Sequence, residues 1–313
     1  MSRSIKWSKN NVPDLSGRVA VITGANSGTG YEATRILVAK SMHVVMACRN
    51  VSKATDAAEK IKRNFPNASL EVINNDLADL SSIKTFAEEF GRKHNKLDVL
   101  VNNAGVMQTP HLRTKDRFEL QIGVNHFGHF ALTGLLFDRL RRAEEGRVVT
   151  MSSFVHYSGK MVFDDLNWER RSYNRLGAYA QSNLANLLFA YELQRRISKK
   201  ECGIKSFGTH PGYARTNLQS SGLQLDKGLG AKIQRGVYRI TGIFAQSASR
   251  GAEPLVMAAT DPHLHGGEYL GPKRLYGTPQ VLKSSKDSYD ETAANKLWEI
   301  SEAVTGITYH ALL

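Results

Sequence analysis

The sequence predicts an α/β fold, a doubly wound parallel sheet with helices on both of its faces. Apolar runs of strand length alternate with helical stretches of ten or more residues along much of the 313-residue chain, which is the pattern of βαβ units. The runs are also continuously apolar, as expected for strands that are covered on both faces. Right-handed crossovers then wind the sheet in both directions from its first strand.

Each element follows from a local pattern. Residues 18–40 contain a strand, a Gly-rich turn and a helix, and a serine is expected to cap the helix over 80–94. Further strands are predicted within residues 43–48, 69–77, 97–105, 147–153, 203–212 and near 267–270. Helices are predicted over residues 51–64, 80–94, 115–142, 177–199 and 246–259.

Composition and charge exclude several protein classes. No run approaches the ~18 apolar residues of a transmembrane helix, and residues 1–15 lack the apolar segment of a secretory signal. Cys48 and Cys202 lie far apart in predicted strands and are expected as buried free thiols. Because no disulfide framework or metal-ligand spacing is present, we expect a cytoplasmic protein without a metal site. The net charge of +13 is scattered, which favours a solvated basic surface over nucleic-acid binding.

A Gly-rich turn after the first strand points to a dinucleotide. The stretch TGANSGTG places Gly24, Gly28 and Gly30 where the backbone can turn tightly and approach a pyrophosphate at a helix N-terminus. The spacing differs from the G-x-G-x-x-G fingerprint, so the support comes from the position of the turn in the fold. A purely structural turn is the alternative.

The next two strands end in residues suited to the adenosine half of a dinucleotide. Arg49, with Lys53 one turn further on, stands where an acidic residue would accept from a ribose 2′-hydroxyl. An arginine there can pair with a 2′-phosphate, so we expect NADP(H) in preference to NAD(H). The alternative is that Arg49 is simply exposed. Asp76 could accept from the adenine amino group, cap the next helix, or do both.

Taken together, these motifs resemble the short-chain dehydrogenase/reductase family. The motifs that carry the resemblance are, in the family's order, TGANSGTG, NNAG (102–105), Asn125, the serine pair 152–153, Tyr179 and HPGYART (210–216). The stretches ACRN, LANLLFAYELQRR and HPG are similar to the retinol-dehydrogenase-like branch, which includes dehydrogenases of lipophilic alcohols. The resemblance implies a sheet of about seven strands, a Rossmann-type fold and the use of NADP(H).

The resemblance also implies a role for each motif. Ser153, and not Ser152, would bind the substrate oxygen, Tyr179 would transfer the proton, and Asn125 would take part in a water relay. The long helices at 115–142 and 177–199 form dimers and tetramers across the family, which makes a homodimer or homotetramer an expectation. The expected cofactor-binding residues are Gly24, Asn26, Ser27, Gly28, Thr29, Gly30, Arg49, Asp76, Leu77, Asn103, Ala104, Gly105, Tyr179, Asn183, Pro211, Gly212 and Thr216.

Two positions depart from the family's pattern. Thr29 stands where an apolar residue is usual, and Asn183 stands where the Tyr-x-x-x-Lys motif has lysine. Asn183 still shares a helix face with Tyr179 and is expected to act with it, because its amide can bond to the ribose. It cannot supply the charge that lowers the tyrosine pKa. A free tyrosine titrates near 10, so tyrosinate at neutral pH needs about 4 kcal/mol of stabilisation.

The sequence therefore predicts an NADP(H)-dependent oxidoreductase acting on the carbonyl or alcohol of a small or lipophilic substrate. Since carbonyl reduction needs neutral tyrosine, we expect an attenuated site biased toward reduction. The alternative is an NADP(H)-binding sensor or interaction protein with little catalysis, which Asn183 favours and the intact Ser–Tyr–Asn set opposes. His156, Arg175 and His210 lie near the site motifs and are candidates for a substitute cation. His210 belongs to the HPG pattern and Arg175 is expected to face solvent, so neither of these two is given a catalytic role.

No interdomain linker is evident, so a single domain over residues 1–313 is expected. Apolar residues of the expected lid suggest an apolar substrate wall, although they would equally suit the core of a lid helix: Leu223, Leu225, Leu229, Ile233, Val237 and Ile240. The expected parts are an N-terminal extension (1–15), a dinucleotide-binding core with the active site (16–216), a substrate lid (217–245) and a C-terminal part (246–313).

Overall fold

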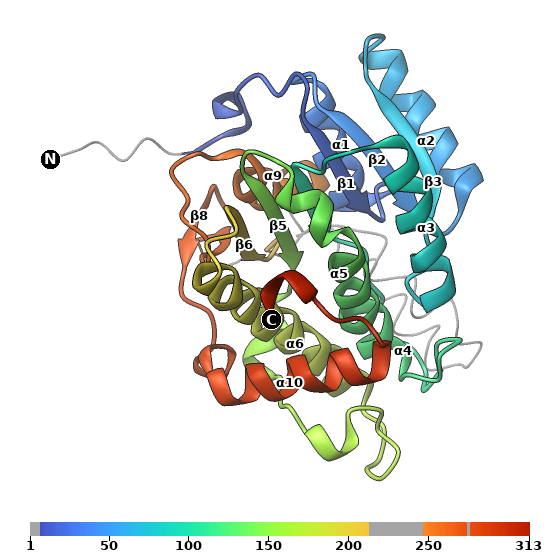
Figure 1. Cartoon of the computed structure of the whole chain (residues 1–313), viewed down its shortest axis with the longest axis vertical. Helices are drawn as coiled ribbons and strands as arrows, with labels where there is room; N and C mark the ends of the chain where they lie inside the picture. The colour runs from blue at the N-terminus through green and yellow to red at the C-terminus, as the bar shows by residue number, and fades with distance from the viewer. Residues whose placement is uncertain (1–6, 213–246, 274–275) are drawn as a thin grey trace, which may run out of the picture.

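The computed structural model describes residues 7–212, 247–273 and 276–313, so the expected lid and Thr216 lie outside the described residues. Its centre is a sheet of eight strands in the order β3-β2-β1-β4-β5-β6-β7-β8 (Figure 1). The strands are β1 (Val19–Thr23), β2 (His43–Cys48), β3 (Leu70–Asn74), β4 (Val99–Asn102), β5 (Gly146–Met151), β6 (Ile204–Thr209), β7 (Tyr269–Pro272) and β8 (Pro279–Leu282). Seven are parallel to their neighbours, and the eighth, β8, adds an antiparallel edge.

Helices cover both faces of the sheet, which confirms the doubly wound α/β fold. The helices are α1 (Gly28–Val38), α2 (Val51–Asn64), α3 (Leu80–Lys93), α4 (Leu120–Ile122), α5 (Gly128–Arg141), α6 (Arg175–Lys199), α9 (Ala248–Thr260) and α10 (Glu291–Thr305). Along β1, Ala20 and Ile22 enter the core under α1, α2 and α9. Val21, between them, enters the core under α3, α5 and α6, because successive side chains of a strand point to opposite faces.

The helix predicted over 115–142 is shorter and irregular. It begins with α4 at Leu120, passes through a π-helical turn over Gly123–Phe127 and continues as α5 to Arg141. Before it, the buried carboxylate of Glu119 accepts hydrogen bonds from two backbone N–H groups of the first turn, each at 2.9 Å. Arg117 has a φ of 69°, which no right-handed helix accommodates. The helix therefore starts at the Glu119 cap.

The chain beyond β8 adds a helix that the sequence analysis did not place. Its cap, Asp290, accepts from the N–H of Ala293, and Gly306 ends it in the left-handed conformation with a φ of 67°. The helix, α10, packs against α6 (Figure 1). None of the helices in the described ranges is both long enough and apolar enough to cross a membrane. Both cysteines are free; Cys48 is buried, whereas Cys202 lies half-buried just before β6 and not within a strand.

Candidate active site

The turn after β1 depends on its glycines. Gly24 and Gly28 have φ values of 65° and 58°, which residues with a Cβ rarely adopt. A Cβ on Gly30 would lie 2.5 Å from Asn103 Nδ2, so no larger residue fits without rearrangement. The side chain of Ser27, at the N-cap of α1, makes no capping hydrogen bond to the described residues. The first N–H groups of α1 can therefore receive an anion, which fits a dinucleotide pyrophosphate.

A hydrogen-bond network joins this turn to the end of β4. Thr23 Oγ1 accepts from the N–H groups of Asn103 and Ala104, both at 2.9 Å, and Asn103 Nδ2 donates to the Thr23 carbonyl at 2.8 Å. Thr29 Oγ1 donates to Asn103 Oδ1 at 2.7 Å. The hydroxyl of Thr29 thus has a structural partner, and the two motifs expected to hold the cofactor lie side by side.

His129 supports the same network and was missed by the sequence analysis. Its Nδ1 lies 2.9 Å from the Asn125 carbonyl oxygen, which can only accept, so Nδ1 carries the proton. Its Nε2, 2.9 Å from Thr23 Oγ1, then accepts from that hydroxyl. Burial lowers the pKa of His129 to about 4, which keeps the ring neutral. The sequence feature that could have indicated this role is that His129 lies one helical turn after Asn125.

The end of β2 presents a cation to solvent. Arg49 directly follows Cys48, the last residue of β2, and is exposed. Its backbone carbonyl accepts from Asn74 Nδ2 at 3.0 Å, while Asn50 caps α2 by accepting from the N–H of Lys53 at 2.9 Å. The backbone around Arg49 is therefore fixed, and its guanidinium remains accessible to an anionic ligand.

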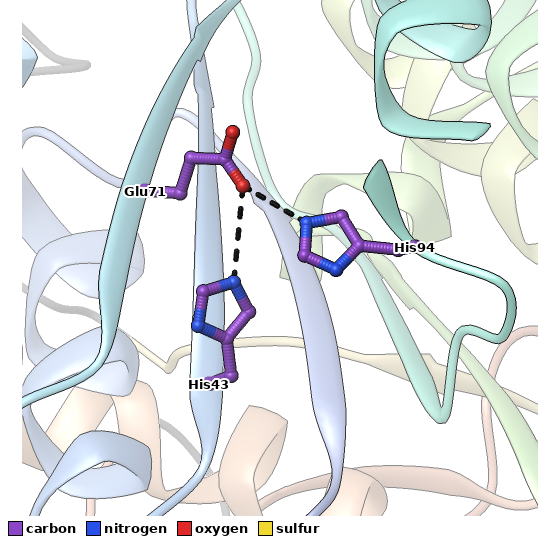
Figure 2. Close-up of side chains that lie close together, drawn as sticks. All are labelled: His43, Glu71 and His94. Atoms are coloured by element: carbon purple, nitrogen blue, oxygen red, sulfur yellow. Dashed lines mark hydrogen bonds and ion pairs between the residues drawn. The ribbon is translucent and has the colours of Figure 1, made fainter. Parts of the chain in front are cut away.

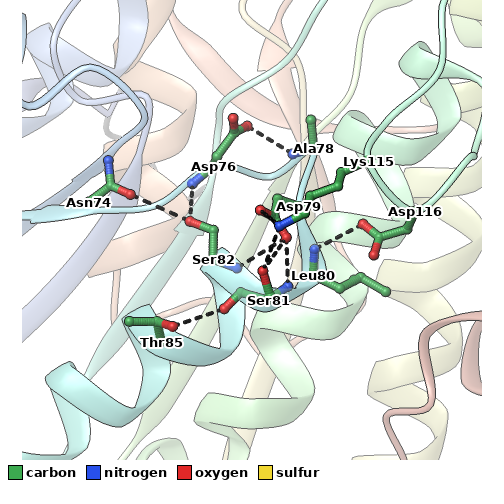
Figure 3. Close-up of polar contacts among 10 residues, drawn as sticks. All are labelled: Asn74, Asp76, Ala78, Asp79, Leu80, Ser81, Ser82, Thr85, Lys115 and Asp116. Carbon is green, nitrogen blue, oxygen red and sulfur yellow. Dashed lines mark hydrogen bonds and ion pairs between the residues drawn. The ribbon is translucent and has the colours of Figure 1, made fainter.

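Asp76 lies in a polar turn just after β3 (Figure 3). Its Oδ1 accepts from the N–H of Ala78 at 3.0 Å, and its own N–H donates to Ser82 Oγ at 3.0 Å. The cap of α3 is Asp79, which accepts from the N–H groups of Ser81 and Ser82. The predicted serine cap is therefore wrong, because Asp79 lies immediately before the first turn. Of the roles left open for Asp76, capping of this helix is excluded, since Asp76 lies three residues before the cap.

Tyr179 and Asn183 lie one turn apart on α6, and both are buried, with 7% and 5% of their surface exposed. The helix starts behind Asn174, whose side chain accepts from the N–H of Gly177 at 2.8 Å. Asn183 Nδ2 donates to the backbone carbonyl of Tyr179 at 2.8 Å. Part of the hydrogen-bonding capacity of Asn183 is thus used inside the helix, and the residue adds no charge beside Tyr179.

The two serines after β5 have different environments. Ser152 is buried, and its hydroxyl donates to the backbone carbonyl of Asn183 at 2.9 Å, which fixes α6 to the end of β5. Ser153 is half-buried and caps a short 3-10 turn, where its Oγ accepts from the N–H of Val155 at 3.5 Å. The hydroxyl proton of Ser153 can therefore be donated to a ligand, whereas that of Ser152 is engaged.

Asn125 braces the site from the π-helical turn. Its Oδ1 accepts from the N–H of Val106 at 2.8 Å, and its Nδ2 donates to the Val106 carbonyl at 3.0 Å and to Ser182 Oγ at 2.9 Å. These bonds join the loop after β4 to α6. Both side-chain N–H protons are therefore engaged in positioning, and the water-relay role implied by the resemblance stays a prediction.

The imidazoles near the site motifs are neutral. His156 Nδ1 donates to the Ser153 carbonyl at 2.7 Å, and its Nε2 accepts from the N–H of Ser285 at 3.1 Å; burial lowers its pKa. His210 Nδ1 accepts from the N–H of Gly212 at 3.1 Å, and burial, with a smaller effect of His156, lowers its pKa to about 4. Neither ring can replace the positive charge of a lysine at neutral pH.

The end of β6 completes the described part of the site. His210 follows β6, Pro211 and Gly212 are half-buried, and Gly212 has a φ of 67°. A Cβ on Gly271 of β7 would lie 2.0 Å from His210 Nε2, so β7 packs directly on this histidine. The residues expected to contact a cofactor thus occur after β1, β2, β3, β4 and β6, at the carboxyl edge of the sheet where doubly wound folds bind ligands.

Sequence comparison decides the family. The profile described as short chain dehydrogenase matches residues 18–224. The chain belongs to the short chain dehydrogenase family. This family member is 38% identical to human retinol dehydrogenase 12 over 300 residues, covering 94% of this chain and 88% of that protein. It is 36% identical to human retinol dehydrogenase 13 over 298 residues, covering 94% and 86% of the two chains.

Solved structures agree with this assignment. The crystal structure of a protein from Mycobacterium paratuberculosis matches with a TM-score of 0.80 and 36% identity, over 97% of this chain and 99% of that one. A short chain dehydrogenase from Escherichia coli CFT073, solved in complex with NADPH, matches with a TM-score of 0.59 and 20% identity, over 82% and 97% of the two chains. The second likeness concerns the fold alone. This chain is therefore a short chain dehydrogenase-type oxidoreductase.

Proposed function

We propose that this protein is an NADP(H)-dependent oxidoreductase that interconverts a carbonyl and an alcohol, with a bias toward reduction. The observation that carries the proposal is the setting of Tyr179. It is buried on α6, a turn away from Asn183, whose carbonyl is bonded to Ser152 at the end of β5. The part of α6 that carries Tyr179 is thus bonded to Ser152 after β5, and the position four residues after Tyr179 has no charge.

Each site residue has its own role in the proposed reaction. The nicotinamide, when bound, supplies the hydride for reduction and accepts it in oxidation. Ser153 donates a hydrogen bond to the substrate oxygen and orients it, and it keeps its own proton. Tyr179 gives its hydroxyl proton to that oxygen during reduction and removes it during oxidation. Asn125 acts as a positioning residue, because it holds the loop after β4 against α6.

The direction of the reaction follows from the missing charge. Asn183 is neutral, and His156 and His210 are neutral as well. An unperturbed tyrosine titrates near pH 10, so at pH 7 only about one in a thousand is ionised. Reduction uses the abundant protonated form directly, whereas oxidation needs the rare tyrosinate. We therefore expect oxidation to be slow at neutral pH and to accelerate in alkaline solution.

The exposed guanidinium at the end of β2 supports the choice of NADP(H). Arg49 is followed by Asn50 and has no acidic residue beside it in the sequence. The planar guanidinium of arginine can pair with a 2′-phosphate through two parallel hydrogen bonds. A carboxylate at this position would favour NAD(H), because it accepts from the free 2′-hydroxyl.

Exposed aromatic residues next to Ser153 support an apolar substrate. Phe154 and Tyr157 are 51% and 49% exposed, and their ring centroids lie 5.1 Å apart. Exposed apolar surface of this kind often marks a binding site. The retinol dehydrogenases to which the chain is similar are named for a lipophilic alcohol. We therefore expect aldehydes or ketones with an extended apolar body.

The decisive experiment measures turnover of a panel of apolar aldehydes and ketones with NADPH and with NADH, and of the matching alcohols with NADP⁺, at pH 6 to 10. We expect measurable reduction with NADPH, weaker reduction with NADH, and oxidation that becomes detectable toward pH 10. Tight NADPH binding without turnover of any compound would instead establish a cofactor-binding protein without catalysis.

A further inference from the structure

A second group of chemically active side chains lies near the start of β2, whereas the candidate active site lies where the strands end. Figure 2 shows its three members, His43, Glu71 and His94, pointing toward one another. His43 opens β2, Glu71 lies in β3, and His94 is the C-cap of α3. Glu71 pairs with Val45, so it shares a sheet face with His43, two residues before Val45. Because α3 covers that face, its end brings His94 to the other two side chains.

The three side chains offer a compact set of metal-ligating atoms. Glu71 Oε2 lies 2.9 Å from His94 Nε2 and 3.9 Å from His43 Nε2, and one ligand atom from each residue lies within 4.8 Å of the others. Tetrahedral zinc, with bonds of about 2.0–2.1 Å, separates its ligand atoms by roughly 3.3 Å. Side-chain rotations that move the ligand atoms by about 1 Å would bring all three atoms to one ion.

The strongest indication is the Nε2 atom of His43, which is buried and has no hydrogen-bond partner among the described residues. Its Nδ1 lies 2.7 Å from Ser69 Oγ. When Nδ1 donates to this hydroxyl, the Nε2 lone pair faces the Glu71 carboxylate, and a cation can bind between the two. Histidines that bind metals usually have such a partner on their second nitrogen.

Lys93 engages only one oxygen of the carboxylate. Its Nζ lies 2.5 Å from Glu71 Oε1 and 2.7 Å from Glu89 Oε1, so Glu71 Oε2 remains for the two histidines. The side chains of His43, Glu71 and His94 keep 26%, 21% and 15% of their surface exposed. An ion can therefore reach the cluster from solvent. Lys93 itself would compete with the ion for the charge of Glu71.

We propose that His43, Glu71 and His94 form a site for a divalent transition-metal ion of the zinc class. Two imidazole nitrogens and one carboxylate oxygen suit zinc, and water would complete the coordination. His43 lies about 17 Å along β2 from the strand end that precedes Arg49. The ion therefore fastens β2, β3 and the end of α3 to one another and takes no part in hydride transfer. The three ligands are far apart in the sequence, so no ligand spacing reveals them.

The test uses the full chain without an affinity tag. Zn²⁺ binding is measured by equilibrium dialysis, coordination by the visible spectrum of the Co²⁺ complex, and stability by the rise in Tm when Zn²⁺ replaces a chelator. We expect one ion per chain, a spectrum of tetrahedral cobalt and a Tm rise of several degrees. His43→Gln, Glu71→Gln and His94→Gln should each weaken binding at least tenfold and remove most of the rise.

Two further variants sharpen the result. His263→Gln alters an exposed histidine outside the cluster and should bind Zn²⁺ as the unaltered chain does. Lys93→Gln removes the competing ammonium group and should tighten binding. Each variant is compared with itself in chelator, so a change in basal stability does not obscure the metal effect. The proposal is overturned if the unaltered chain binds no ion, or if the three ligand variants bind it as well as His263→Gln does.

Discussion

At the scale of single residues, Asn183 is accommodated on α6 without a charge. The backbone carbonyl of Asn183 accepts from the Ser152 hydroxyl, and its side-chain Nδ2 donates to the backbone carbonyl of Tyr179. Asn183 therefore has hydrogen-bond partners in the fold although it carries no charge. Sequence spacing was sufficient to place Asn183 beside Tyr179, because residues four apart share a helix face. Spacing could not reveal that the amide bonds back to its own helix, since this depends on the rotamer in the folded protein.

Restoring the charge should accelerate oxidation most. In Asn183→Lys, a cation one turn from Tyr179 would stabilise tyrosinate, and each unit by which the tyrosine pKa falls gives about tenfold more base at neutral pH. We expect alcohol oxidation at pH 7 to rise by about 10- to 100-fold and its pH profile to move to lower pH. Asn183→Met, of similar length and uncharged, is the control. Equal oxidation rates in the two variants would show that charge at this position is irrelevant.

The cofactor preference should depend on Arg49. In Arg49→Gln, loss of a guanidinium that pairs with a 2′-phosphate should raise the KM for NADPH by about tenfold or more, since charge-assisted pairs contribute about 1.5–3 kcal/mol. The KM for NADH should change little. Lys53→Gln, which removes a positive charge one turn further along α2, is the control for a general loss of charge. An equal rise in KM for both cofactors would contradict a specific phosphate contact.

At the scale of the elements, the sequence placed strands and helices well but not their ends. The strand patterns and the helix at 177–199 agree with β1 to β7 and α6. The helix predicted at 115–142 begins only after residue 119, because the buried Glu119 carboxylate caps its first turn. The cap of α3 was also misassigned. Capping depends on which side chain reaches the free N–H groups. From the sequence alone, several polar residues near the start of a helix are equally suitable caps.

Asp79 should stabilise α3 in a pH-dependent manner. It caps the helix and lies 2.7 Å from Lys115 Nζ; partial burial opposes its ionisation, but Lys115 and the Ser81 and Ser82 donors outweigh burial and lower its pKa from 3.8 to about 2. The folded pKa is below the unfolded one, so this stabilisation is present above about pH 4 and is lost as the pH falls through 2.

Denaturant unfolding of two variants checks this assignment. Asp79→Ala should lower the free energy of unfolding by about 1–2 kcal/mol at pH 7. Asp79→Asn keeps the capping oxygen and loses only the pairing with an exposed lysine, so its cost should be under about 1 kcal/mol. The difference between the unaltered protein and Asp79→Ala should narrow as the pH falls from 4 toward 2. Equal losses in both variants would rule out capping as the main contribution.

For the whole molecule, the C-terminal region is part of the core beside the sheet. The ring centroid of Trp298, on α10, lies 5.1 Å from that of Phe130, 5.9 Å from that of Phe189 and 4.6 Å from that of Tyr309. The Tyr309 hydroxyl donates to the Phe130 carbonyl at 2.7 Å. These residues come from α5, α6, α10 and the segment after it. The C-terminal segment therefore packs against α5, which follows the turn that holds Asn125, and against α6, which carries Tyr179.

Removing the centre of this aromatic layer should destabilise the entire protein. Trp298 is 2% exposed, and Trp298→Ala should lower the free energy of unfolding by about 3–5 kcal/mol through lost burial and a cavity. Trp298→Phe, which keeps an aromatic ring, should lose clearly less. Thermal unfolding followed by circular dichroism measures both. A loss below about 1 kcal/mol for the alanine variant would mean that α10 unfolds independently of the sheet.

The sequence by itself determined the alternation of strands and helices, the Gly-rich turn and the position of Tyr179 and Asn183 on one helix face. These features depend on contacts between residues close together in the chain, and their periodicity can be read directly. Only the tertiary structure decided the Thr29–Asn103 bond, the neutral His129 beside Thr23, and the grouping of His43, Glu71 and His94. Each of these joins segments that are far apart in sequence and meet only when the sheet has assembled, so no local pattern records them.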